Sequence, residues 1–284
     1  MLTRQIIDVA HASDGARSIV TRRELAMSLA LAASCMTATR SFAQNLSADT
    51  SPLPNPTKFQ SGDLLWPKKR NVYVPYLSGS DADPKEDERQ WIADRDSFVA
   101  DISTTAPYLT ATDVERLRTL SFQEFYHRYV GDQVPDTPGV YASKGGIYVG
   151  HVGIIEIDPL GQPWVIEAIS GPGVIRHSYQ DWLDGRPNEL VWHGRVRSDK
   201  DRARIAVQAK TYLGRPYKFW NFDLADASSF YCSKLAWLSI RDALEFAIDG
   251  KNEPKRSFWF SPKKLLYLDT IERLHEPAEV YFSP

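Results

Sequence analysis

Cys232 stands at the start of a predicted helix, where a cysteine side chain could act as a nucleophile. From Phe230 to about Ile248 the residues are good helix formers, and apolar residues recur at three- and four-residue steps. Ser229 fits the N-cap, and Gly250 lies just past the other end. Backbone N–H groups in a first helical turn stabilise a thiolate. Cys232 is therefore either a nucleophile or a small buried residue that packs the helix start.

A histidine and a carboxylate are expected to face each other on a β-hairpin. Residues Ile147 to Ile157 and Trp164 to Ile169 have strand character and flank a turn at residues 158–161. If this turn centres near position 159 or 160, His151 lies directly or diagonally opposite Glu167, with both side chains on one face. Such a carboxylate orients an imidazole. The alternative is a partly exposed cross-strand pair, but the glycines beside His151 permit close approach by another element and favour the first interpretation.

The other histidines do not form a ligand set. We expect His177 and His193 to be loop or surface residues, and we assign Asp63 to a turn cap without a catalytic role. One cysteine with scattered histidines lacks the ligand spacing of a zinc site. We therefore expect neither a metal nor a cofactor.

The first 43 residues have the pattern of an export signal. Thr21-Arg22-Arg23-Glu24-Leu25 is a twin-arginine pattern, an apolar run follows it, and Ser41-Phe42-Ala43 offers small residues for cleavage. We expect a periplasmic or secreted protein. The alternative is a membrane-anchored lipoprotein with a lipid on Cys35, because Ala32-Ala33-Ser34-Cys35 resembles a lipoprotein processing site.

Export changes the interpretation of the two cysteines. Cleavage after Ala43 removes Cys35 and leaves Cys232 without a disulfide partner. In an oxidising compartment, an unpaired thiol is either buried and inert or retained for its reactivity. This favours a functional Cys232.

The rest of the chain is expected to form one domain. Residues 44–60 contain several prolines among polar residues and predict an extended linker before a domain at 61–284. Within it, residues 78–139 predict a helical insertion, with capping boxes starting at Thr112 and Ser121. The net charge of −2 gives no basic field, so no nucleic-acid partner is expected. No segment after the signal is long and apolar enough to span a membrane.

Several motifs resemble one protein family when they are taken in order. They are Gly62-Asp63-Leu64-Leu65, His151-Val152-Gly153, Leu213-Gly214-Arg215-Pro216-Tyr217, Tyr231-Cys232-Ser233 and Ser261-Pro262-Lys263-Lys264-Leu265. The chain is similar to the NlpC-type cysteine peptidases. Because the histidine precedes the cysteine, it resembles their circularly permuted branch, the YiiX/YaeF-like papain-fold amidases. The resemblance implies an α+β fold in which an antiparallel sheet packs on helices.

The resemblance also implies an activity and a set of site residues. Cys232 would be the nucleophile, His151 the general base and then the general acid, Glu167 the group that orients the imidazole, and Tyr217 a residue of the substrate site. An amide or ester of a cell-wall peptide or an acyl lipid would be hydrolysed through an acyl-enzyme. The alternatives are an acyltransferase or thioesterase using the same residues, and a lipid- or peptide-binding module without turnover.

Overall fold

The structure is a computed structural model that describes residues 52–69, 76, 83–130 and 150–277. All of these residues belong to one compact unit, Asp49–Pro284. The predicted export signal, Cys35 and the first part of the predicted linker lie outside the described residues. Within the described parts of the chain, no helix has the length and apolar character needed to cross a membrane.

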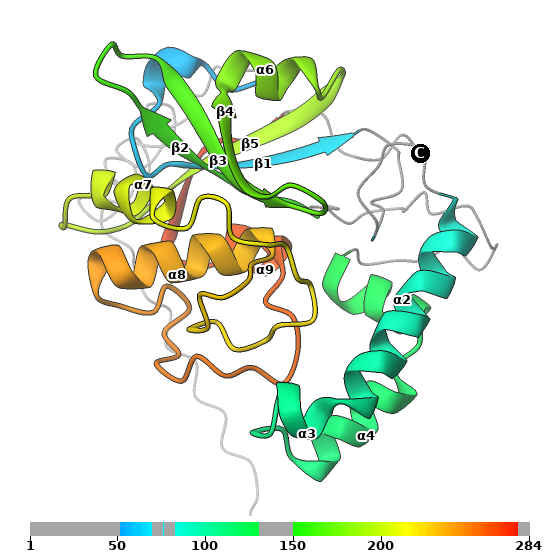
Figure 1. The fold of residues 1–284 in the computed structure, drawn as a ribbon. Coiled ribbons are helices and arrows are strands. Elements are labelled where there is room, and N and C mark those ends of the chain that lie inside the picture. The colour runs from blue at the N-terminus through cyan, green and yellow to red at the C-terminus, as the bar shows by residue number, and fades with distance from the viewer. Residues whose placement is uncertain (1–51, 70–75, 77–82, 131–149, 278–284) are drawn as a thin grey trace, which may run out of the picture. The chain divides into compact units, whose positions relative to one another are not determined.

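Six antiparallel strands form one sheet in the order β4-β3-β2-β1-β5-β6 (Figure 1). The first strand in the chain therefore lies inside the sheet, between β2 and β5. The bounds are β1 Leu64–Lys69, β2 Gly153–Ile157, β3 Pro163–Ile169, β4 Gly173–Ser178, β5 Glu189–Val196 and β6 Ile271–His275.

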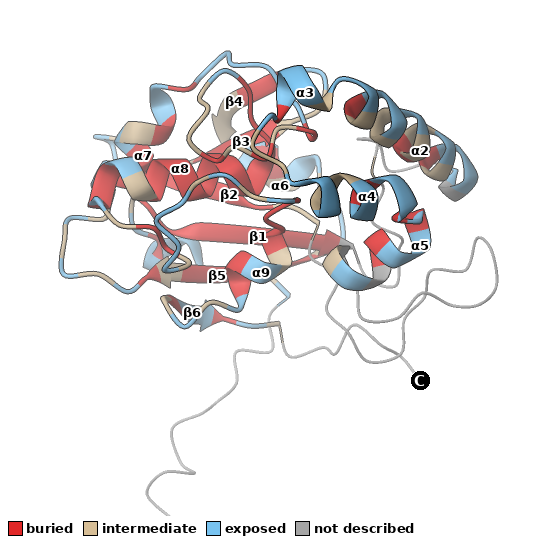
Figure 2. Cartoon of the chain, turned by 90° about the horizontal axis from the view of Figure 1, so that it is seen from below, coloured by how far each residue is buried: buried red, intermediate tan, exposed pale blue. Residues whose placement is uncertain are grey.

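Helices pack on both faces of this sheet, as its alternating side chains require. Leu64 and Trp66 of β1 belong to the main core, which includes most of α8, whereas Leu65 belongs to a smaller core with Trp182 of α6. Figure 2 shows that α8 is buried along nearly its whole length. The helix bounds are η1 Pro56–Lys58, α2 Pro84–Ala100, α3 Ile102–Thr105, α4 Ala111–Thr119, α5 Phe122–Phe125, the π-helix η2 Tyr126–Val130, α6 Tyr179–Asp184, α7 Ala203–Lys210, α8 Cys232–Leu244 and α9 Pro262–Leu266.

Helices α2 to α5 and η2 fill the described part of the region predicted as an insertion. The second predicted capping box is present, since Ser121 and Glu124 bond each other's backbone N–H groups. The first was misplaced by two residues, because Thr110 rather than Thr112 makes the box with Asp113. Aromatic rings join these helices to the rest of the unit, for example Phe125 against Trp259 at 5.7 Å between centroids.

The described residues before β1, 52–63, are packed on the sheet. The carbonyl of Pro52 accepts a hydrogen bond from Val191 N–H at 3.0 Å. Asn55 caps η1 through its side chain, and Phe59 is buried against the rings of Tyr179 and His193. Ordered structure therefore begins before position 61, because an apolar side chain within the proline-rich stretch is buried in the smaller core.

Candidate active site

Cys232 is the first residue of α8 and is 5% exposed. The predicted cap was wrong: Tyr231 is the N-cap, and its side chain makes no capping hydrogen bond. The Ser229 hydroxyl accepts a hydrogen bond from Asn221 at 2.8 Å instead. The helix ends at Leu244, well before Gly250. The first backbone N–H groups of α8 are therefore available near the Cys232 sulfur.

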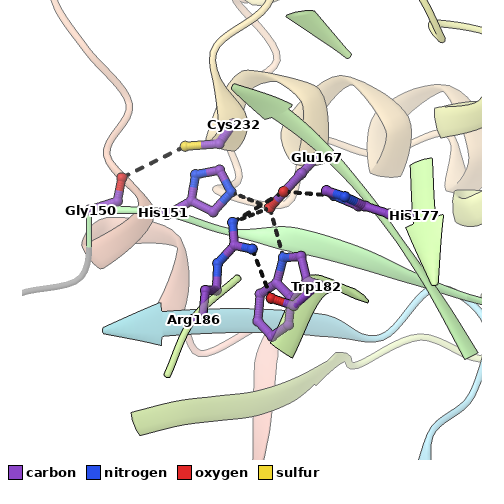
Figure 3. Close-up of polar contacts among 7 residues, drawn as sticks. All are labelled: Gly150, His151, Glu167, His177, Trp182, Arg186 and Cys232. Atoms are coloured by element: carbon purple, nitrogen blue, oxygen red, sulfur yellow. Dashed lines mark hydrogen bonds and ion pairs between the residues drawn. The ribbon is translucent and has the colours of Figure 1, made fainter. Parts of the chain in front are cut away.

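His151 lies two residues before β2, and its ring lies between Cys232 and Glu167 (Figure 3). The β2–β3 register pairs Ile154 with Ile166, which puts His151 diagonally opposite Glu167 on one face. Its Nε2 is 2.7 Å from a carboxylate oxygen of Glu167. An ionised carboxylate only accepts hydrogen bonds, so Nε2 carries a proton and Nδ1 is left to exchange a proton with the thiol.

Glu167 is fully buried in β3 and accepts hydrogen bonds from four side chains. Besides His151, the donors are His177 of β4 at 2.8 Å, the Trp182 indole at 2.8 Å and Arg186, which reaches both oxygens at 3.0 and 3.1 Å (Figure 3). The Arg186 guanidinium also stacks over the Trp182 ring, 4.5 Å from its centroid. These contacts hold the carboxylate in one orientation.

Electrostatics favour an ionised Glu167 and a protonated His151. Burial raises the pKa of Glu167, but the His151 charge, the hydrogen bonds from His151 and His177 and the Arg186 charge outweigh it, so the pKa lies well below its usual value. Burial lowers the pKa of His151, but the charge of Cys232, the charge of Glu167 and a hydrogen bond to each raise it to about 10. The site therefore favours the imidazolium form beside the sulfur.

Gly153, the first residue of β2, has a different role from the one expected. A Cβ at Gly153 would lie 2.6 Å from Cγ1 of Val165 in the neighbouring strand. Gly153 thus makes room for β3, rather than for α8. The contact with α8 is made by the other glycine: the carbonyl oxygen of Gly150 lies 3.9 Å from the sulfur of Cys232.

Tyr217 lies at the same site as Cys232. It forms an isolated bridge with Phe230, just before α8. Its side chain lines the small cavity that contains Cys232, and burial together with the Cys232 charge raises its pKa. The structure thus brings all four predicted site residues, Cys232, His151, Glu167 and Tyr217, to one place.

Two histidines were placed wrongly from the sequence. His177 is in β4 and bonds Glu167, and His193 is a buried residue of β5 bonded to Asp63 at 2.8 Å. Asp63 does cap its turn, through Gln60 N–H at 2.8 Å. Parity could have identified His177: β3 pairs with β4 so that Glu167 faces Ile175, and His177 lies two residues on, on the same face.

The two other donors to Glu167, Trp182 and Arg186, could not be predicted from strand parity. Trp182 lies in α6 and Arg186 just after it, and contact with Glu167 requires this helix to fold back over the β3–β4 hairpin. Among the described residues, no group of three or more His, Cys, Asp or Glu side chains could hold a metal ion.

Comparison with known families gives the site its context. The model of a family described as permuted papain-like amidase enzymes, YaeF/YiiX, C92 family, matches residues 141–258. Over this stretch the chain is therefore similar to the permuted papain-like amidases. The match covers Cys232, His151, Glu167 and Tyr217, while helices α2 to α5 lie outside it. The resemblance, the fold class and the prediction of an enzyme acting on amide bonds are confirmed at this level.

Among solved structures, the chain is similar to the crystal structure of the metalloprotein yiiX from Escherichia coli O157:H7. The sequence identity is 20% and the TM-score 0.36, over 45% of this chain and 83% of that chain. No match was found among curated proteins.

Proposed function

We propose that this chain is an exported cysteine hydrolase that cleaves an amide bond through an acyl-enzyme on Cys232. One observation carries the proposal: the imidazole of His151 lies between the Cys232 sulfur and the buried Glu167 carboxylate (Figure 3). A nucleophile, a base within reach and a group that orients the base are the requirements of covalent acyl transfer.

Each proton has a place in this scheme. Nδ1 of His151 takes the thiol proton, and the thiolate attacks the amide carbonyl carbon to form a tetrahedral intermediate. His151 then gives that proton to the leaving amine as the C–N bond breaks, which leaves the acyl group on sulfur. Water attacks this thioester, giving one proton to His151, and the carboxylic acid and the free thiol are released.

The start of α8 supplies the partner for the negative oxygen of the intermediate. Because a helix start has unpaired backbone N–H groups and the N-cap side chain makes no capping hydrogen bond here, the Cys232 N–H can donate to that oxygen. Tyr217, which lines the same cavity, is positioned to contact the substrate.

The test of this proposal is to detect the acyl-enzyme. The protein lacking residues 1–43 would be incubated with cell-wall peptides and with N-acyl lipids, and Cys232 would be examined by mass spectrometry for the added acyl group. We expect Cys232→Ala and His151→Ala to reduce turnover roughly a thousandfold or more. Full activity of Cys232→Ala would contradict the proposal, and transfer of the acyl group to an added amine would identify an acyltransferase.

Export is proposed from the twin-arginine pattern and the small residues before Gln44. The compact unit that holds the site begins at Asp49, just after the expected cleavage point. N-terminal sequencing of protein from the cell envelope should find a start at or near Gln44. A start at Met1 would contradict export by cleavage, and a lipid on Cys35 would establish the lipoprotein alternative. For an exported enzyme, we propose amides of cell-envelope peptides or acyl lipids as substrates.

A further inference from the structure

The cavity beside the Cys232 sulfur is small and lined by aromatic side chains. Its volume is about 50 Å³. Apart from Gly150 and Cys232, the described residues that line it are all aromatic: Tyr76, Phe122, Phe125, Tyr126, Tyr217, Phe219, Tyr231 and Trp259. No charged side chain of the described residues contributes to this lining. A group that enters the cavity therefore gains by leaving water if it is apolar and loses by doing so if it is charged.

The helical region outside the family match builds part of this wall. Phe122 and Phe125 come from α5, and Tyr126 begins η2; all three are buried. Phe125 stacks on Trp91 of α2 with ring centroids 5.0 Å apart. It also contacts Phe219, which precedes α8, and Trp259, which follows it. Rings packed from both sides resist displacement, so the wall sets a limit on the size of the occupant.

A second, larger cleft adjoins this cavity and has a different character. Its volume is about 370 Å³, it opens more widely to solvent, and it shares Tyr76, Tyr217 and Phe219 with the cavity. Polar side chains enter its lining, among them Asp94 of α2 and the exposed Lys218. The Tyr76 hydroxyl donates to Asp94 at 2.7 Å and accepts from the Trp220 indole at 2.8 Å, which fixes the tyrosine between the two spaces.

The two spaces suit the two sides of a scissile amide. The acyl group stays on the Cys232 sulfur after the first step, so it needs a place against the cysteine, whereas the amine must depart and needs an open route. At about 10–15 Å³ for each water-sized group, the cavity volume accommodates roughly three to five such groups and no long alkyl chain.

We propose that the aromatic cavity is the acyl-side subsite and selects a compact apolar group next to the scissile carbonyl. This inference rests on the proposed function and narrows its substrates. They are peptide-like amides with a small apolar side chain on the carbonyl side and a polar amine side in the larger cleft, rather than long-chain acyl lipids. The aromatic residues of α5 and η2 then determine specificity, although they lie outside the matched family region.

Acylation by p-nitrophenyl esters of increasing chain length tests the proposal without knowledge of the natural substrate. The acetate, butyrate, octanoate and laurate esters would be compared by p-nitrophenol release, after subtraction of the Cys232→Ala rate, and by the intact mass of the acylated protein. We expect butyrate to acylate Cys232 at least tenfold faster than octanoate or laurate. A rate that is equal or higher for the long chains overturns the proposed subsite and leaves the hydrolase proposal standing. Absence of acylation by every ester contradicts both.

Substitutions in the wall provide a second measurement. Phe125→Leu and Phe122→Leu enlarge the cavity and should raise the octanoate-to-butyrate ratio about fivefold or more. Phe222→Leu is the matched control: Phe222 is buried among the same aromatic residues but is absent from the lining described for both spaces, so its ratio should change less than twofold. An unchanged ratio in folded Phe125→Leu and Phe122→Leu would contradict the assignment. If neither variant folds, the comparison of ester chain lengths with the wild-type protein still tests the proposed subsite.

Discussion

The carboxylate of Glu167 connects His151 to a set of donors that the family motifs do not contain. His177, Trp182 and Arg186 all bond it, and its pKa is held well below the usual range despite burial. A charged acceptor with this many donors keeps the Nε2 proton of His151 in place. We therefore treat His177, Trp182 and Arg186 as positioning residues that act through Glu167.

Glu167→Gln tests whether the negative charge of this side chain is needed, because glutamine has nearly the same shape as glutamate but is neutral. One amide oxygen can still accept from His151, but the NH₂ group must face another donor, so we expect partial activity, with kcat lowered about tenfold or more. Loss of the charged acceptor should lower the free energy of unfolding by about 1–3 kcal/mol.

Glu156→Gln is the matched control for Glu167→Gln. Glu156 is also a buried strand carboxylate, but its two oxygens accept hydrogen bonds from Arg176 and Lys210 instead of from His151. Urea unfolding and steady-state kinetics would be measured for both variants. Both should lose stability, and the kcat of Glu156→Gln should stay near wild type. Equal kcat values for the two variants would show that Glu167 does not position the base.

The pairing of His151 with Glu167 could be predicted because a hairpin fixes which residues share a face. A turn centred at position 159 or at position 160 gives the same answer, because the two registers differ by two residues; a slip of one residue would have turned Glu167 to the opposite face. Arg186 could not be predicted. Its contact with Glu167 depends on the direction in which the chain leaves α6, and neither periodicity nor a turn motif encodes this. The aromatic wall at Cys232 was missed for a similar reason, since ring stripes are typical of any core.

At the level of elements, the short helix α5 presents Phe122 and Phe125 to the site, and its start is fixed by the Ser121 capping box. Ser121→Ala removes the hydroxyl that bonds Glu124 N–H and should cost about 1 kcal/mol of unfolding free energy. If α5 shapes the cavity, this change should also alter the chain-length preference of acylation.

Thr110→Ala is the corresponding change in α4, where Thr110 makes the same kind of box with Asp113. Thermal unfolding should show a similar loss of stability, because the capping geometry is alike. The acylation profile should stay that of the wild type, since no residue of α4 lines the described part of the cavity. If both variants shifted the chain-length preference, that preference would reflect the overall loss of stability rather than the position of α5.

Helix positions were predicted better than helix ends. The apolar periodicity located α2 and α8, because apolar side chains recur at helical spacing in both sequences. The caps predicted at Thr112 and Ser229 were each two residues from the true N-cap. Local sequence preference does not distinguish between candidate capping residues that lie so close together. The capping residue is decided by where the chain turns into the helix, which depends on tertiary packing.

For the whole molecule, the raised pKa of His151 predicts how stability depends on pH. The folded value of about 10 exceeds the ordinary 6.5, so folding favours the imidazolium. This contribution is fully present below about pH 6.5 and is lost as the pH rises through about 10. Urea unfolding of wild type and His151→Gln should therefore differ more at pH 6 than at pH 10.5. A difference that is constant with pH would contradict a raised pKa.

Cys232→Ala is the control for this dependence. Cys232 and Glu167 both raise the His151 pKa. Removing the sulfur should reduce the change of stability with pH without abolishing it, because Glu167 remains. Comparison of wild type, Cys232→Ala and His151→Gln over the same pH range would separate the two partners.

The position of β1 inside the sheet has a consequence for the order in which the chain can assemble. Of the described strands, this one leaves the ribosome first, yet its two neighbours begin at Gly153 and Glu189. Both of its edges therefore stay open until most of the chain has been synthesised, and closing such long loops is slow. Unpaired strand edges invite pairing with other chains. During synthesis, β1 can therefore pair wrongly with other chains, because neither of its edges is covered. This exposure ends only when β5 has been synthesised and can pair with it.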